Sequence, residues 1–262
     1  MYYFALTMTT EEADKYLQDL GFFNPGHDFQ KLWAFGKALV GDREMHRLKD
    51  LVTGNYNDGE EQILRKCAED SFFRIIHSQK YDLFRQELIW LDEVLPKEVF
   101  VADLGCHTGH ITTALARMRP SSRFMGFDCL KKPIEKANLL RERFSCENLS
   151  FEHRDAFDLQ ISPKPDGLIS LQGVGLALSS KPLADAVCNI ADIPSFFIIV
   201  ERFENINELK ATYDNLAANG FICAHQHLLM VDSLFCKGAL PGFIFTKGHP
   251  NDPISFEKLV IK

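Results

Sequence analysis

Short apolar runs alternate with helical patterns along the chain from residue 99 onward. Five of these runs have the length of a strand, at 99–103, 123–128, 149–153, 167–171 and 195–201. Most of their positions are apolar, which is typical of strands that are buried on both faces. Strands of this kind, separated by helices, predict a parallel sheet covered by helices on both sides. Ligands of such sheets bind beyond the carboxyl ends of the strands.

Two further runs, at 221–231 and 243–246, bring the prediction to seven strands. The fold class that follows is α/β, with a doubly wound, mostly parallel seven-stranded sheet and helices on both faces. Helices between the strands are expected at 110–118, 133–144 and 206–218, with another that begins at Pro182.

The first third of the chain carries helical patterns only, and the pattern changes near Pro96. Thr9 and Glu12 have the spacing of a capping box, which predicts that a helix begins there. Residues 28–51 are expected to be helical, although their pattern is broken, and an apolar stripe over 81–95 predicts a further helix. We therefore expect an N-terminal helical cap, residues 1–95, followed by a sheet-containing domain, residues 96–262.

Composition and charge narrow the range of functions. The formal net charge of −7 argues against a large nucleic-acid-binding surface, because such surfaces depend on clustered lysine and arginine. The N-terminus lacks the basic start of a signal peptide, and no apolar stretch approaches the roughly 20 residues that span a bilayer. These observations predict a cytoplasmic protein that has no membrane partner.

Neither the cysteines nor the histidines show a recognisable metal-binding spacing. The seven cysteines include no C-x-x-C pair, so free thiols in a reducing compartment are expected. His225 and His227 would point the same way on the sixth strand, yet no third ligand can be identified for them. We therefore predict no metal site.

The segment with the most chemical content is 101–110, VADLGCHTGH, between the first strand and the helix after it. Gly105 and Gly109 permit a tight turn and allow a ligand to come close to the backbone. The phosphate-binding pattern of dinucleotide enzymes, G-x-G-x-x-G, would require glycine where this chain has His107 and His110. An NAD or flavin oxidoreductase is therefore the weaker interpretation of this loop.

The segment resembles the first motif of class I S-adenosylmethionine-dependent methyltransferases, acid-x-Gly-x-Gly-x-Gly, with His107 at the middle glycine. In that family the loop holds the methionine part of the cofactor, and the acid serves its ammonium group. The resemblance therefore assigns Asp103, Gly105, Cys106, His107 and Gly109 to the cofactor. A carboxylate suits a ligand that carries cationic groups. The nearby helix N-terminus would lower the pKa of the Cys106 thiol, although bound cofactor would cover it.

The resemblance continues at the ends of the next three strands. Asp128 resembles the family's acid that binds both ribose hydroxyls, and Cys129 would then lie beside the adenine. Asp155 and Ala156 follow the third strand, where an acid of the family accepts a hydrogen bond from the adenine amino group. Leu171 ends the fourth strand, which borders cofactor and substrate in the family. The resemblance covers about 99–247 and implies a Rossmann-like methyltransferase domain with S-adenosylmethionine as cofactor.

These motifs do not identify the methyl acceptor. A small or medium molecule, methylated on oxygen or nitrogen, is favoured because no Asn-Pro-Pro-Tyr type sequence follows the fourth strand. The alternatives are a protein or RNA methyltransferase, or a non-enzymatic module that binds S-adenosylmethionine. Residues at strand ends that could face the substrate are Gln172, Glu201, Arg202 and His225. The aromatic N-terminal helices are expected to form a lid over an apolar substrate, and they offer a surface for a homodimer.

Overall fold

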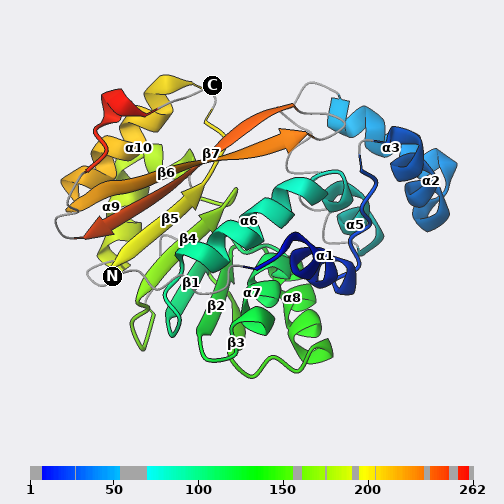
Figure 1. Cartoon of the computed structure of the whole chain (residues 1–262), viewed down its shortest axis with the longest axis horizontal. Coiled ribbons are helices and arrows are strands. Elements are labelled where there is room, and N and C mark those ends of the chain that lie inside the picture. Colours follow the sequence, from blue (N-terminus) through cyan, green and yellow to red (C-terminus); the bar gives the residue numbers. More distant parts are fainter. Residues whose placement is uncertain are drawn as a thin grey trace. The chain divides into compact units, whose positions relative to one another are not determined.

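The computed structural model describes residues 8–26, 28–53, 70–155, 161–174, 176–190, 195–203, 205–232, 237–247 and 253–259. The chain divides into two compact units (Figure 1). The first unit comprises Met1–Val94 and Met230–Gly238, and the second comprises Leu95–Leu229 and Ala239–Lys262. The role of residues 1–95 as a substrate lid stays a prediction.

The first unit is built mainly from helices. These are α1 (Thr10–Asp19), α2 (Phe29–Val40), α3 (Asp42–Thr53), α5 (Asp70–Ser78) and α6 (Tyr81–Val94). The capping box at the start of α1 is confirmed, because the Glu12 N–H donates to Thr9 Oγ1 at 3.2 Å and the Thr9 N–H donates to Glu12 at 2.8 Å. The helical pattern predicted over 28–51 is confirmed, and its break lies at Gly41, which ends α2 with a φ of +83° before α3 begins at the next residue.

The second unit contains the seven-stranded sheet, and the predicted fold class is confirmed. The strands are β1 (Phe100–Leu104), β2 (Arg123–Asp128), β3 (Leu149–His153), β4 (Gly167–Leu171), β5 (Phe196–Val200), β6 (Phe221–Asp232) and β7 (Lys237–Lys247). Their order across the sheet is β3-β2-β1-β4-β5-β7-β6. The strands from β1 to β5 are parallel to their neighbours, whereas β7 runs antiparallel to β5.

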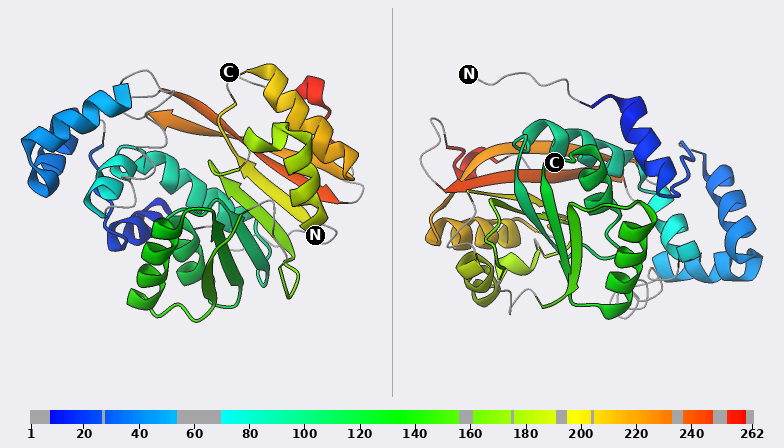
Figure 2. Two further views of the ribbon diagram at one scale, coloured as in Figure 1. Left: turned by 180° about the vertical axis from the view of Figure 1, so that it is seen from behind. Right: turned by 90° about the horizontal axis from the view of Figure 1, so that it is seen from below.

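Helices cover both faces of the sheet (Figure 2). The helices of this unit are α7 (His110–Met118), α8 (Lys131–Arg143), α9 (Lys181–Ile190) and α10 (Ile206–Ala218). Alternate residues of β1, including Ala102 and Leu104, join one core with apolar side chains of α9 and α10. The remaining residues of β1 point to the opposite face, and α7 and α8 pack against β2 and β3. Within the described ranges, no helix has both the length and the hydropathy needed to cross a membrane.

The strand β7 begins at Lys237, earlier than the predicted start of the run at 243. Proline has no N–H to donate to a sheet hydrogen bond and is largely confined to sheet edges. In the sequence, Pro241 therefore argues against a strand that continues through this position. The register with β5 starts only at Gly242, opposite Val200. Pro241 is therefore tolerated because this part of β7 lies beyond the end of β5.

The turn after β1 packs tightly against the loop after β4. Gly105 has a φ of +76°, and a Cβ atom added there would lie 2.8 Å from the Cα atom of Gly173. The backbone N–H groups of Gly105 and Cys106 both donate to the carbonyl of Phe127, at 2.8 and 3.0 Å. The turn is thus held by the neighbouring strand β2 while it touches the loop after β4, and no side chain fits at its first glycine.

We predict that Gly105→Ala lowers the free energy of unfolding by about 3 kcal/mol, because left-handed backbone strain of about 1–2 kcal/mol is added to a backbone clash. Gly26→Ala is the matched control, since Gly26 has a φ of +59° with no atom near the added Cβ. It should cost only about 1 kcal/mol. Urea denaturation followed by circular dichroism measures both variants, and equal losses would contradict the close approach as the cause.

Candidate functional site

The carboxyl ends of the five parallel strands lie at one edge of the sheet. Asp103 of β1 is in register with Gly126 of β2, which places Asp128 just beyond it on the neighbouring strand. His153 ends β3 in register with Asp128, and Leu171 ends β4 in register with Val200. The fold therefore brings the predicted site residues at the ends of β1, β2 and β4 to the same edge.

Asp103 is a buried carboxyl group. Its side chain is 3% exposed, and the Thr112 hydroxyl of α7 donates to Asp103 Oδ2 at 2.5 Å. Burial, together with the charge of Asp128, raises the pKa of Asp103 to about 7, although the hydrogen bond from Thr112 opposes the shift. The sequence analysis did not predict this role of Thr112, because no motif links a threonine on a helix to an acid on a strand.

Asp128 holds the glycine-containing loop by accepting two backbone hydrogen bonds. Its Oδ2 accepts from the His107 N–H at 2.9 Å, and its Oδ1 accepts from the Leu130 N–H at 2.8 Å. Each carboxylate oxygen has a second lone pair, so the group can still accept hydrogen bonds from a ligand. Asp128 is half-buried at the edge of the sheet, where a ligand can reach it.

The loop itself contains an uncommon backbone conformation. His107 has a φ of +49°, a left-handed value that non-glycine residues seldom adopt. Gly109 follows with a φ of +67°, caps α7, and donates its N–H to the Cys106 carbonyl at 2.8 Å. The middle position of the motif thus keeps a glycine-like backbone although it carries a histidine, and the hydrogen bond to Asp128 fixes it.

Two ionisable side chains of the loop are held in their neutral forms. The expected lowering of the Cys106 pKa was wrong, because burial and the charges of Asp103 and Asp128 raise the pKa of this thiol well above its ordinary value. Burial also lowers the pKa of His110 to about 3, and the ring lies 3.0 Å from the Thr108 hydroxyl. The loop therefore offers neither a reactive thiolate nor a cationic ring at position 110.

The ends of β2 and β3 are linked through backbone groups. His153 Nε2 lies 3.0 Å from the carbonyl oxygen of Cys129, and the Arg154 N–H donates to the Asp128 carbonyl at 3.0 Å. Cys129 and Asp155 are exposed, so both side chains are accessible to a ligand at this edge. Ala156, also expected at the cofactor, lies outside the described residues.

The end of β4 makes a second left-handed turn. Gln172 has a φ of +57°, and its N–H donates to the Val200 carbonyl at 2.7 Å. The Ser170 hydroxyl accepts from the Val174 N–H at 2.9 Å. Leu171 and Gln172 thus lie in a turn that is held by hydrogen bonds. The Gly173 contact with the turn after β1 was missed in the sequence, because it joins segments far apart in the chain.

The other residues proposed to face the substrate are placed differently. Glu201 is buried, and its Oε1 accepts from the Arg202 N–H at 3.0 Å, whereas the Arg202 side chain is exposed. His225 and His227 lie on one face of β6 as predicted, with ring centroids 6.4 Å apart. Across the described part of the chain, no group of three or more His, Cys, Asp or Glu side chains could hold a metal ion.

The donors and acceptors at this edge fit a cationic, hydroxyl-bearing ligand better than a pyrophosphate. The N–H of His107, which a phosphate would need, already donates to Asp128. Two carboxyl groups at the edge would repel an anion. Asp103 can pair with an ammonium group and Asp128 can accept from two neighbouring hydroxyls, which are the groups that S-adenosylmethionine carries.

Comparisons with known proteins identify the fold family. Residues 96–214 match the family model described as a methyltransferase domain. The chain is similar to magnesium protoporphyrin IX methyltransferase from Synechocystis PCC 6803 with bound S-adenosylmethionine, at 17% identity and a TM-score of 0.51, covering 94% of this chain and 100% of that one. It is also similar to the 4+2 cyclase SpnF, at 13% identity and a TM-score of 0.52, covering 65% and 82%. No curated protein matches the chain at a significant level.

Similarities to solved structures at these identities establish the fold, and the family model identifies the kind of domain. The resemblance inferred from the sequence motifs is confirmed, and S-adenosylmethionine is the cofactor of this kind of domain. Residues 96–214 form a class I S-adenosylmethionine-dependent methyltransferase domain.

Proposed function

We propose that this methyltransferase methylates oxygen or nitrogen on a small or medium molecule, and that its cofactor lies at the edge formed by Asp103 and Asp128. The proposed cofactor site is supported by one observation, namely that these two acids lie at the ends of neighbouring strands. Asp103 is buried and has a pKa of about 7, and Asp128 holds the loop between them through the His107 N–H. Bound S-adenosylmethionine supplies an activated methyl group, so the protein must mainly align the acceptor with it.

The proposed roles follow the chemistry of each residue. Asp103 pairs with the ammonium group of the cofactor, and Asp128 accepts from the ribose hydroxyls. Gly105 and Gly109 keep the loop free of side chains beside the methionine part. The remaining cofactor residues proposed for this site are Cys106, His107, Cys129, Asp155, Ala156 and Leu171.

A small or medium acceptor is supported by charge and by the turn after β4. The net charge of −7 disfavours a polyanionic substrate such as RNA. The turn after β4 reads LQGV, with the neutral amide of Gln172 and no Asn-Pro-Pro-Tyr sequence. We further propose a cytoplasmic location, and a homodimer formed through the N-terminal helices; both stay predictions.

Transfer of isotope-labelled methyl groups tests the acceptor class. Purified protein is incubated with labelled S-adenosylmethionine and, separately, with mixtures of phenols, carboxylic acids and amines, with RNA, and with protein extract. We expect label in the small-molecule fraction, and Asp103→Asn should reduce it at least tenfold. Label found only in RNA or protein would overturn the proposed acceptor class. Cofactor binding without transfer to any acceptor would instead favour the non-enzymatic module.

The raised pKa of Asp103 predicts that cofactor binding is linked to a proton. Below about pH 7 the free protein holds this carboxyl neutral, whereas pairing with an ammonium group requires the carboxylate. Binding of S-adenosylhomocysteine at pH 6 should therefore release a proton, and affinity should rise up to about tenfold per pH unit until about pH 7. Calorimetry in buffers of different ionisation enthalpy measures the release. Asp103→Asn should bind more weakly and release none; an unchanged release would contradict the assignment.

The ribose assignment predicts that Asp128→Asn weakens S-adenosylhomocysteine binding by about 10- to 100-fold, because charged hydrogen bonds to the ligand are each worth about 1.5–3 kcal/mol. Asp166→Asn is the matched control. Asp166 also accepts a backbone hydrogen bond, from the Phe100 N–H at 2.8 Å, but at the opposite edge of the sheet. Its replacement should leave the affinity unchanged. Equal effects of the two substitutions would show that Asp128 acts through folding alone.

A further inference from the structure

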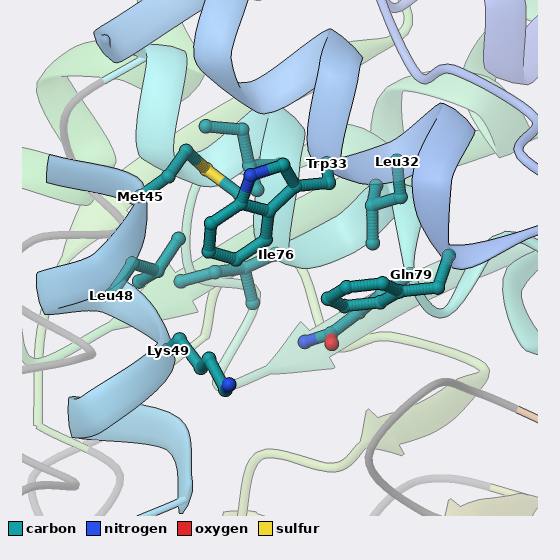
Figure 3. Close-up of a pocket in the computed structure, with 9 residues that line it drawn as sticks. Leu32, Trp33, Met45, Leu48, Lys49, Ile76 and Gln79 are labelled. Atoms are coloured by element: carbon teal, nitrogen blue, oxygen red, sulfur yellow. The ribbon is translucent and has the colours of Figure 1, made fainter. Parts of the chain in front are cut away.

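The pocket between α2, α3 and α5 in the first unit has no room for a ligand. Its volume is about 20 Å³, which is space for about one water molecule. Its lining is almost entirely apolar and includes Trp33, Met45 and Ile76 (Figure 3). A contact that can serve a ligand lies instead in the second unit, at the carboxyl end of β1, where Thr112 of α7 meets Asp103.

Thr112 and Asp103 form a buried polar pair between α7 and β1. Neither residue is more than 3% exposed, and the Thr112 hydroxyl lies 2.5 Å from Asp103 Oδ2. The hydroxyl supplies a hydrogen-bond donor, whereas an ionised carboxylate only accepts, so this bond favours the charged form of the acid. The bond engages Oδ2, and Oδ1 therefore keeps its lone pairs for a ligand.

The helix α7 holds the Thr112 hydroxyl in a fixed position. Thr112 lies in the first turn of α7, where the Thr113 N–H donates to the Gly109 carbonyl at 2.8 Å. A threonine in a helix has few χ1 rotamers, and its hydroxyl often bonds to a carbonyl of the preceding turn. The Thr112 hydroxyl donates to Asp103 instead. Because the branched side chain has little rotamer freedom to lose, it can orient the acid at low entropic cost.

The next residue of α7 provides a direct comparison with Thr112. Thr113 is also fully buried, yet among the residues that the structure describes its hydroxyl has no hydrogen-bond partner. The two threonines share their side chain, their helix and their burial, and they differ in the contact with Asp103. Thr113 is therefore a matched control for substitutions that remove the Thr112 hydroxyl.

The other groups around Asp103 disfavour or do not support its ionised form. Burial and the charge of Asp128 on β2 raise the pKa of Asp103 to about 7, whereas the hydrogen bond from Thr112 lowers it. On the other side, β4 places the apolar Ile169 in register with Asp103. In the loop, the raised pKa of the Cys106 thiol keeps that group neutral. The Thr112 hydroxyl therefore opposes the burial that keeps the acid protonated.

We propose that Thr112 is a positioning residue for the cofactor, because its hydroxyl holds the Asp103 carboxylate with Oδ1 available to the ammonium group. Thr112 acts through Asp103 and does not itself contact the ligand. Its role rests on the proposed pairing of Asp103 with the ammonium group of the cofactor. Without the hydroxyl, the carboxyl group would lose its donor and could rotate, so the ion pair would weaken while the contacts to the nucleoside remain.

Calorimetry at pH 7 with two ligands tests the proposal on the full-length protein. S-adenosylhomocysteine carries the ammonium group, whereas 5′-methylthioadenosine has the same nucleoside and sulfur but no amino acid part. Thr112→Val replaces the hydroxyl with a methyl group, and Thr112→Ala is a second variant without the hydroxyl. Both should weaken S-adenosylhomocysteine binding about ten-fold and leave 5′-methylthioadenosine binding unchanged. Thr112→Ser and Thr113→Val should bind both ligands as the wild type does.

Carboxyl NMR of the ligand-free protein gives a readout that a merely structural role would not move. The Asp103 carboxyl carbon, assigned by comparison with Asp103→Asn, should titrate near pH 7 in the wild type. In Thr112→Val and Thr112→Ala its midpoint should lie about one to two pH units higher, because the charged form has lost a hydrogen bond. Thr112→Ser and Thr113→Val should titrate as the wild type does.

The proposal is overturned if the two variants without the hydroxyl bind S-adenosylhomocysteine as the wild type does, or if they weaken both ligands equally. It is equally overturned if Asp103 titrates at the wild-type pH in these variants. Asp103→Asn separates these results from a failure of the proposed function. If Asp103→Asn binds S-adenosylhomocysteine as tightly as the wild type, the pairing with the ammonium group itself fails. If it binds weakly while the Thr112 variants bind normally, only the role of Thr112 fails.

Discussion

The site at the sheet edge depends on one carboxylate, that of Asp128. It accepts from the His107 N–H and from the Leu130 N–H, and so connects the turn after β1, the end of β2 and the start of α8. His107 has a left-handed backbone that costs about 1 kcal/mol or more for a residue with a side chain. Hydrogen bonds to a charged acceptor are worth about 1.5–3 kcal/mol, enough to offset that strain. The glycine-like loop can therefore carry a histidine because an acid holds it.

The charge on Asp128 also affects its neighbour. Asp103 is buried, and the negative charge of Asp128 close by raises its pKa further, to about 7, so the Asp103 carboxyl group is neutral below about pH 7. A bound ammonium group would favour the ionised form of Asp103, so its proton would pass to solvent and an ion pair would replace the neutral carboxyl group. A pyrophosphate is negatively charged, so carboxylates at both positions would repel it. The electrostatics thus favour the same ligand class as the motif pattern.

Strand ends were predictable because local residues mark them. The bounds of β2, β3 and β4 were predicted to the residue, since acids, proline or glycine interrupt each apolar run there. The hydrogen bond from Thr112, the contact of Gly105 with Gly173, and the direction of the Cys106 pKa were not predictable. Each depends on burial or on a segment distant in the chain. The helix N-terminus was expected to lower the pKa of the Cys106 thiol, because it is close in sequence. Burial raises this pKa and outweighs that effect.

Hydrogen bonds from other segments occupy backbone groups of the outermost strand, β6. β6 is an edge strand, which would ordinarily offer its backbone to another strand. Within the first unit, however, the Gln86 amide donates to the Met230 carbonyl and accepts from the Met230 N–H, both at 2.9 Å. A carboxamide provides one donor and one acceptor, as a backbone residue does, so Gln86 occupies the place of a further strand. In the second unit, the Ile254 N–H donates to the Cys223 carbonyl at 2.9 Å. A strand that paired with β6 through Met230 would have to displace the Gln86 contacts.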